Sequence, residues 1–503
     1  MSAPHQDDII EDEPEMLDAD EAGEVIEDDG DIAMDSDDEG GDRVEMDFQN
    51  DSVAYFDSHK HAIYAIAQHP TLPTLIATGG SEGEEESDPG KGYVFDTSPV
   101  VGRPVLPQSY NADPTAPQQR STELTPLFAI DGHTDSVNAL AFTLPRGEYL
   151  VSGGLDGRLR AHTLKIDARN KASFSFLAES QEVQEINWIA PCPVVGADSP
   201  AAPNTIALGA DDGSVWVYTI DASDASNPLQ IVQSYYLHGG PCTAGAWSPD
   251  GKFLATVAED STLNVWDVWG VAAAKGLTNP NGQTVVSLTV FKDEADNMKQ
   301  RKKDEDEEPE RLGLFSVAVD PKSSFVAVGG FYPGNPCLKI VSLPHFGTGG
   351  SKNTKGDKPG GAILMELPVQ RESVETLAFS PGKPLLAAGS VDGSIVVYDT
   401  SKNFRAKRTI NEAHDHAAVV KLDFVRSHGD GWLLTSCGMD GVVRRWNIQG
   451  EADAVADSMV REWRGHSPID ETGRGGILGF VQGSTGERIV TAGDDGLALV
   501  FET

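Results

Sequence analysis

Eight short phrases of one shape recur along this chain of 503 residues, and this repetition narrows the possible folds more than any single residue does. Each phrase is an apolar run rich in small residues that stops at a tight turn, in most copies Asp-Gly. The phrases begin at Leu75, Leu150, Ile206, Leu254, Val326, Leu386, Leu434 and Val490. In five copies an aromatic residue follows the turn aspartate by six positions, at Tyr218, Trp266, Tyr398, Trp446 and Phe501. Self-similarity of this kind predicts a fold built from one repeated unit.

Each repeat is predicted to be a small antiparallel sheet. Alternating apolar residues predict strands, and Asp-Gly between two such runs predicts a hairpin because glycine adopts positive φ without strain. Another apolar run that ends in a Pro/Gly turn precedes each phrase, as in residues 243–251 and 374–382. A histidine stands before several of these runs, at His133, His238, His414 and His466. The predicted order is therefore outer strand, histidine turn, inner strand, Pro/Gly turn, second strand, aspartate turn and third strand.

This order resembles the WD-repeat β-propeller, whose repeat spans ~40–45 residues with a Gly-His start and a Trp-Asp end. The resemblance implies that the histidine, a Ser or Thr of the second strand, the turn aspartate and the aromatic residue form a buried hydrogen-bonded set in each blade. The positions that we expect to serve this structural role are His133, Ser152, Asp156, Asp260, Trp266, Asp392, Asp440, Trp446 and Asp495. The match is degenerate, since Trp-Asp closes only one unit and His162 replaces the aromatic residue of the second unit.

The units predict an all-β fold, an eight-bladed WD-repeat β-propeller. The printed chain stops at Thr503, directly after the third strand of the last unit, so that unit lacks an outer strand. The apolar run 52–59 before the first unit can supply it, and we expect this N-terminal strand to close the ring, which would remove the free sheet edges. The predicted domains are an acidic tail over residues 1–50 and the propeller over residues 51–503.

The charge of the chain is strongly one-signed. The net charge is −41, and residues 1–50 hold 21 Asp or Glu against the single basic residue Arg43. Such a segment cannot bury enough apolar surface to offset its chain entropy, so we expect it to be disordered. The rest of the chain is acidic as well. Because phosphate binding depends on Lys and Arg, this charge argues against nucleic acid or an anionic membrane as a direct partner, and it favours a basic partner.

The sequence carries no export signal and no catalytic motif. Its first residues lack a basic and an apolar signal region, and no run approaches ~20 apolar residues. The four cysteines lie in four different repeats without a C-x-x-C pair, which is typical of reduced intracellular thiols. A P-loop, G-x-S-x-G and H-E-x-x-H are all absent. We therefore expect a monomeric binding scaffold with no catalytic residue, no cofactor and no metal.

Three insertions interrupt the predicted ring. Residues 97–124 and 344–361 fall between a third and an outer strand, which places them on the bottom face of a propeller. Residues 292–311 fall between an outer strand and the next inner strand, which places this charged loop on the top face. The basic run 299–303 is compatible with a nuclear-localisation patch or with a solvated mixed-charge loop, and the flanking acids favour the loop.

The partner-binding surface is predicted on the top face. Three positions in each blade point there: the histidine turn, the residue just inside the inner strand, and the residue before the turn aspartate. The acidic residues at or near these positions are Glu82, Asp135, Glu182, Asp211, Glu259, Glu372, Glu375, Asp470, Glu471 and Asp494, and the aromatic ones are Tyr64, Phe315 and Phe331. Few Lys or Arg compete at these positions, so a basic peptide is the expected ligand.

An acidic N-terminus followed by a degenerate eight-unit propeller with a charged insertion resembles the family of angio-associated migratory cell protein. The first-unit sequence ATGGSEGEEE supports this resemblance. Its fungal members act as the dedicated chaperone of large-subunit ribosomal protein L10, the counterpart of bacterial L16. The resemblance implies capture of the basic N-terminal segment of newly made L10 in the cytoplasm and transient contact with late pre-60S particles.

Two other classes of function remain open from the sequence. An acidic tail also suits a histone-binding or nucleolar WD-repeat scaffold, which would place the protein in the nucleus. A ubiquitin-ligase substrate receptor or a trafficking adaptor would need no acidic face. The bound partner distinguishes the three classes: one ribosomal protein, histones, or ligase and trafficking subunits.

Overall fold

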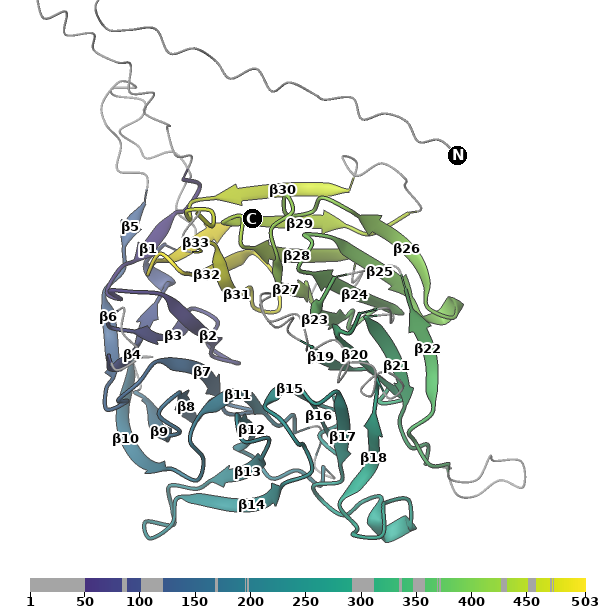
Figure 1. The fold of residues 1–503 in the computed structure, drawn as a ribbon. Coiled ribbons are helices and arrows are strands. Elements are labelled where there is room, and N and C mark those ends of the chain that lie inside the picture. Colours follow the sequence, from purple (N-terminus) through teal and green to yellow (C-terminus); the bar gives the residue numbers. More distant parts are fainter. Residues whose placement is uncertain are drawn as a thin grey trace, which may run out of the picture. The chain divides into compact units, whose positions relative to one another are not determined.

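The computed structural model shows a ring of eight β-sheets (Figure 1). It describes residues 50–503 except 84–87, 101–120, 168–170, 195, 197–198, 292–311, 334–336, 347–357, 369, 371, 427–431, 451–457, 471–472 and 474. One compact unit spans Phe48–Thr503, and the preceding residues form a separate unit that lies outside the described part. The predicted disorder of the acidic tail therefore also falls outside the described residues.

The first four sheets follow the chain in order, each with its inner strand first. They contain β2 (Ile63–Gln68), β3 (Leu75–Ser81), β4 (Gly90–Asp96) and β6 (Pro126–Ile130); β7 (Val137–Phe142), β8 (Tyr149–Gly154), β9 (Leu159–Ile166) and β10 (Ala172–Ser180); β11 (Ile186–Pro191), β12 (Thr205–Ala210), β13 (Val215–Ile220) and β14 (Leu229–Tyr235); and β15 (Cys242–Trp247), β16 (Leu254–Ala258), β17 (Thr262–Trp266) and β18 (Thr284–Thr289). We call these sheets blades 1 to 4.

Blades 5 to 8 repeat the arrangement. They contain β19 (Gly313–Val319), β20 (Phe325–Phe331), β21 (Leu338–Ser342) and β22 (Ile363–Leu367); β23 (Val374–Phe379), β24 (Leu385–Ser390), β25 (Ile395–Asp399) and β26 (Arg405–Ile410); β27 (Val419–Phe424), β28 (Leu433–Gly438), β29 (Val442–Asn447) and β30 (Met459–Arg464); and β31 (Ile477–Val481), β32 (Arg488–Gly493) and β33 (Ala498–Glu502) with β1 (Ala54–Phe56) and β5 (Thr122–Glu123). Short 3-10 turns lie at η1 (Ser98–Val100), η3 (Ala273–Lys275) and η4 (Thr400–Lys402).

All eight repeated phrases form the second strands of the blades. These strands are buried along most of their length, because both of their faces pack against neighbouring blades. Small residues permit this close approach. A Cβ on Gly79 would lie 2.6 Å from Cγ1 of Val137 in the next blade, so glycine is required there.

The N-terminal strand closes the ring, as predicted. β1 pairs antiparallel with β33, with Ala54 opposite Val500 and Phe56 opposite Ala498. The side chains of Ala54 and Phe56 are fully buried between blades. Each inner strand also contacts the inner strands of both neighbouring blades, including β31 with β2 across the closure. The eight-bladed propeller expected from the repeats is thus confirmed.

The segment that returns from the 97–124 insertion adds a strand that the sequence interpretation did not contain. β5 pairs in parallel with the outer side of β1. The Thr122 amide donates to the Val53 carbonyl at 3.1 Å, and the Leu124 amide donates to the Tyr55 carbonyl at 2.8 Å. The closing strand is therefore held on both edges (Figure 1).

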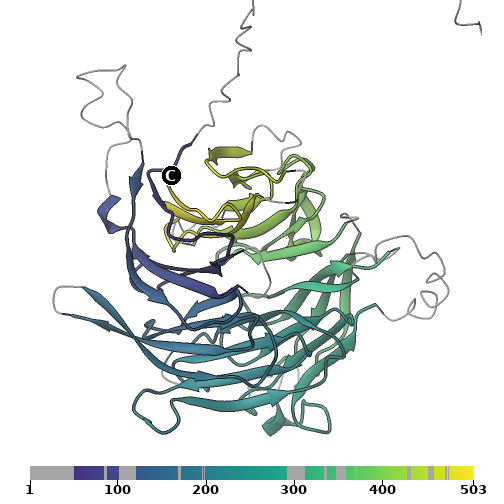
Figure 2. The same ribbon diagram turned by 60° about the vertical axis from the view of Figure 1, so that its left-hand side comes forward.

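The insertions lie at the chain positions that the repeats predict. Residues 97–124 and 344–361 separate a third strand from an outer strand, and residues 292–311 separate β18 from β19. Most of each insertion lies outside the described residues. The strands of each blade run between the two faces of the ring, and the loops that connect the strands lie at these faces (Figure 2). We call the face with the outer-to-inner loops and the second-to-third turns the top face.

Candidate functional site

Buried histidines tie the two kinds of top-face loop together. In blade 2, His133 Nε2 lies 2.9 Å from Ser152 Oγ, and His133 Nδ1 lies 3.1 Å from Asp156 Oδ1. Burial alone would raise the pKa of Asp156, but hydrogen bonds from His133 and from two backbone amides lower it. The turn carboxylate therefore stays charged and fixes the histidine loop against the second-to-third turn.

The same set recurs in blades 7 and 8. His414 Nδ1 lies 2.8 Å from Asp440 Oδ1, and His414 Nε2 lies 2.8 Å from Ser436 Oγ. Trp446 Nε1 donates to the same Ser436 oxygen at 2.8 Å. In blade 8, His466 lies 3.0 Å from Asp495. In these blades the contacts are those that the WD-repeat resemblance implies.

Other blades vary the set. In blade 4, Trp266 Nε1 donates to Thr256 at 2.8 Å, and Asp260 accepts the amides of Thr262 and Gly239. In blade 6 a buried glutamine, Gln370, stands near the turn, and Asp392 accepts the Ser394 amide at 2.8 Å. Here the turn aspartate holds its own hairpin.

A β-bulge near the start of every inner strand, at its second residue in seven blades and at its third in blade 5, turns one side chain out of the regular alternation. The pairing register shifts at this position in all eight blades. The bulged residues are Tyr64, Asn138, Asn187, Thr243, Phe315, Glu375, Val420 and Leu478. Bulges re-aim side chains in this way next to functional sites. They include three predicted site residues, of which Tyr64 is 45% exposed.

Backbone hydrogen bonds bring the predicted carboxylates to the same end of the ring. The amide of Asp211 donates to the Glu185 carbonyl at 3.3 Å, and the amide of Glu259 donates to the Pro241 carbonyl at 3.1 Å. The Asp494 amide donates to a carbonyl of the loop before β31 in the same way. The residue before each of these turns is therefore anchored to the loop that enters the inner strand.

Five carboxylates form what we call the acidic sector: Asp494, Asp135, Glu182, Asp211 and Glu259, from blades 8, 2, 3 and 4. The pKa of Tyr64 in blade 1 is raised by burial and by the charges of Asp494 and Asp135, so the field spans three neighbouring blades. Within the described part of the chain, no Lys or Arg forms an ion pair with any of the five. Their charge is available to a ligand.

The remaining predicted site residues differ in their surroundings. The Glu82 side chain is only 12% exposed and pairs with Lys60 at 3.2 Å, so its charge is already compensated. Phe315 and Phe331 of blade 5 are half-buried. The carboxylates that lie exposed at loops or bulges are Glu372, Glu375 and Asp470, whereas Glu471 lies outside the described residues.

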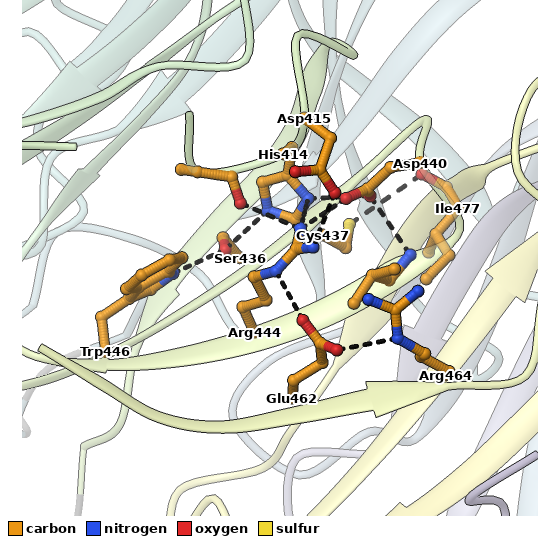
Figure 3. Close-up of polar contacts among 12 residues, drawn as sticks. His414, Asp415, Ser436, Cys437, Asp440, Arg444, Trp446, Glu462, Arg464 and Ile477 are labelled. Atoms are coloured by element: carbon orange, nitrogen blue, oxygen red, sulfur yellow. Dashed lines mark hydrogen bonds and ion pairs between the residues drawn. The ribbon is translucent and has the colours of Figure 1, made fainter. Parts of the chain in front are cut away.

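An arginine network offsets part of the acidity of blade 7, and the sequence interpretation missed it (Figure 3). Arg444 is almost fully buried; its guanidinium pairs with Asp440, with Asp415 at 3.1 Å and with Glu462 at 3.0 Å. It also donates to the Ala413 carbonyl at 2.9 Å. Burial would lower the pKa of Arg444, but these three carboxylates raise it. The arginine is therefore charged and offsets one of the three negative charges that surround it.

Apolar residues occupy the position before the turn in several other blades. These are Leu155 in blade 2, Val391 in blade 6 and Met439 in blade 7. The sequence interpretation selected carboxylates and aromatic residues, and so passed over them. The sequence signal that could have identified them is that they occupy the same position of the repeat as Asp211 and Glu259.

The described part of the chain offers no candidate metal site. No group of three or more His, Cys, Asp or Glu side chains there is placed to hold a metal ion. The four cysteines are buried and form no disulfide with one another, and burial raises the pKa of Cys192 and Cys242 to about 12. No described helix is long and apolar enough to span a membrane.

Known proteins with similar sequences contain WD repeats or take part in ribosome assembly. The family model of the WD domain, G-beta repeat, matches residues 124–162, 229–267 and 361–399. The ribosome assembly protein SQT1 of Saccharomyces cerevisiae is 27% identical over 94% of this chain and 91% of its own length. The human angio-associated migratory cell protein is 22% identical over 91% of this chain and 81% of its own length.

Solved structures extend the comparison. A crystal structure of Chaetomium thermophilum Sqt1 bound to the N-terminus of the ribosomal protein L10 is 53% identical, covers 90% of this chain and 100% of that chain, and has a TM-score of 0.74. Saccharomyces cerevisiae Sqt1 shares the fold at 24% identity with a TM-score of 0.62. With half of its residues identical to Chaetomium Sqt1 over nearly its whole length, the chain belongs to the Sqt1 family of WD-repeat proteins.

Proposed function

We propose that the protein is a non-enzymatic chaperone that captures the basic N-terminal segment of newly made ribosomal protein L10 and delivers it to late pre-60S subunits. The observation that carries the proposal is the 53% identity to an Sqt1 whose structure holds the L10 N-terminus. The acidic sector supplies a surface of matching charge on this chain. We propose the cytoplasm, where ribosomal proteins are made, as the site of capture.

The mechanism is charge-assisted binding over several blades. A basic segment that is disordered when free loses chain entropy on binding, so several contacts are needed to offset that loss. Each carboxylate of the acidic sector can accept charge-assisted hydrogen bonds from Lys or Arg. In blades 2 and 8 the buried histidine sets hold the loops that carry Asp135 and Asp494, so little further ordering of these loops is required. Neutralising the segment in this way would protect it from other polyanions until delivery.

The proposal is tested by identifying what the protein captures. Tagged full-length protein would be recovered from cell lysate and its partners identified by mass spectrometry, beside the double variant Glu182→Lys/Asp211→Lys. The control is Glu487→Lys/Asp221→Lys, which changes the charge equally at two exposed positions on the opposite face. We expect L10 with the wild type and the control, and its loss from the Glu182→Lys/Asp211→Lys variant.

Two outcomes would contradict the proposal. Recovery of histones, or of ubiquitin-ligase or trafficking subunits, in place of L10 would assign one of the other two classes of function. Equal recovery of L10 by all three proteins would keep the client but remove the acidic sector from its binding site.

A further inference from the structure

The side chains on the top face differ between blades: they are acidic in some blades and apolar in others. The position before the second-to-third turn is acidic in blades 3, 4 and 8 but is Val391 in blade 6 and Met439 in blade 7. Val391 is 37% exposed, and Ile469, in the loop that enters blade 8, is 42% exposed. We call Val391, Met439 and Ile469 the apolar sector.

Backbone contacts link the loops and turns that carry the apolar sector. The Ile469 amide donates to the Met439 carbonyl at 2.8 Å, so these two residues adjoin across blades 7 and 8. The blade 6 turn that carries Val391 meets the next loop, since a Cβ on Gly393 would lie 3.0 Å from the Cα of His416. That loop continues to the carbonyl that accepts the Met439 amide at 3.0 Å. Three neighbouring blades therefore contribute to one surface.

The charged side chains around the apolar sector are mostly acidic. Arg444 pairs with Asp440 and Asp415 at the top of blade 7 and offsets part of their charge. On one side lies the exposed carboxylate of Glu372, and on the other side Asp494 of the acidic sector. A ligand that contacts both Asp494 and Glu372 spans the blades that carry the apolar side chains. A purely basic peptide would leave those side chains without a partner.

We propose that the apolar sector binds apolar side chains of the same basic client segment that the acidic sector holds. This inference rests on the proposed chaperone function and explains how the chaperone would distinguish its client from other basic segments. Carboxylates at a solvent-open face accept any Lys/Arg-rich peptide, so charge alone does not separate one client from histone tails or other basic segments. Apolar contacts at fixed distances from the charges supply that difference in affinity.

The two sectors differ in how they respond to salt. Ion pairs at the face weaken as salt is added, because the Debye length falls from ~10 Å at 0.1 M to ~3 Å at 1 M. Burial of apolar surface is not weakened in this way. A client that uses both sectors should therefore retain an affinity at high salt that a charge-only peptide loses.

Three peptides test the inference by isothermal titration with the full-length protein. The first is the N-terminal segment of L10 from the same species, the second has its apolar residues replaced by Ser at unchanged charge, and the third is an oligo-arginine of equal net charge. The protein variant is Val391→Ser/Ile469→Ser. The matched control is Leu364→Ser/Val460→Ser, at two side chains of the outer strands that are 48% and 56% exposed.

We expect the wild type and the control to bind the L10 peptide at least about tenfold more tightly than either comparison peptide, which corresponds to partial burial of one or two apolar side chains. In the Val391→Ser/Ile469→Ser variant this preference should disappear, while affinity for oligo-arginine stays unchanged.

Equal binding of all three peptides by the wild type would overturn the apolar sector but leave the chaperone function intact. An unchanged preference in the variant would do the same. Failure of the wild type to bind the L10 peptide at all would overturn the proposed function, and this inference with it.

Discussion

At the scale of single residues, buried charged side chains and buried rings stabilise the blades and their loops. Arg444 joins the histidine loop, the turn and the outer strand of blade 7 through three carboxylates. His162 takes the place of the aromatic residue in blade 2 and packs 5.3 Å from the ring of Phe128 and 5.8 Å from that of Phe176. Both residues depart from the repeat, and both have consequences that stability measurements can detect.

Arg444→Leu should lower the free energy of unfolding by about 3 kcal/mol, because removing one partner leaves the buried carboxylate of Asp440 uncompensated. Arg464, which pairs with Glu462 and is 45% exposed, is the comparison. Arg464→Leu should cost less than about 1 kcal/mol, as exposed ion pairs do. Urea unfolding at pH 7 measures both. Equal effects of the two substitutions would show that the network does not stabilise blade 7.

His162→Phe should reduce the acid sensitivity of the fold. Burial, with the charge of Arg160, lowers the pKa of His162 to about 4 from a usual 6.5. The folded protein keeps the ring neutral while the unfolded chain takes up a proton near pH 6.5. The stability from this residue is thus complete above pH 6.5 and is lost as the pH falls toward 4, by on the order of 3 kcal/mol.

The measurement is the free energy of unfolding at pH 7 and pH 4.5 for the wild type and His162→Phe. The variant should lose less stability between the two pH values. An identical loss would mean that other groups, among them His59 and His238 with pKa values lowered by burial to about 4, account for the whole effect.

At the scale of elements, the closure of the ring is the feature on which the fold depends. β1 is only three residues long, yet it lies between β33 and β5. Its run of apolar residues next to a histidine made it predictable from the sequence, because the last repeat lacked an outer strand. β5 was not predictable, since a strand of two residues has no periodicity and its partner lies far away in the sequence.

Two truncations separate the tail from the closing strand. Deleting residues 1–45 removes no described strand and should leave the thermal transition nearly unchanged. Deleting residues 1–60 removes β1, including the fully buried Phe56, and should lower the transition sharply or cause aggregation, since losing one buried Phe alone costs about 3–5 kcal/mol. Thr122→Pro, which removes one hydrogen bond between β5 and β1, should have a smaller effect. Equal behaviour of the two truncations would contradict closure by β1.

At the scale of the whole molecule, the repeats predicted the ring because every blade buries the same small-residue strand. The position of the top face followed from the same repeats. Its chemistry did not, because charge in a sequence does not show which carboxylates are already paired. Glu82 pairs with Lys60, and Asp440 of blade 7 pairs with Arg444, whereas Asp135 and Asp211 have no ion-pair partner among the described residues. The residues of the apolar sector could have been identified by comparing the repeats with one another, but a search for charged side chains does not select them.

The central claim is that unpaired carboxylates of the acidic sector bind the basic N-terminal segment of L10. Isothermal titration of that peptide into wild type, Glu182→Lys/Asp211→Lys and the control Glu487→Lys/Asp221→Lys, at two salt concentrations, tests it most directly. Exposed ion pairs give ~0.2–1 kcal/mol each, and a reversed charge adds a repulsion of similar size, so reversing two carboxylates should weaken binding about tenfold. The control should match the wild type, and added salt should weaken both steeply. An affinity unchanged by the Glu182→Lys/Asp211→Lys reversal, with the fold intact by circular dichroism, would contradict the claim.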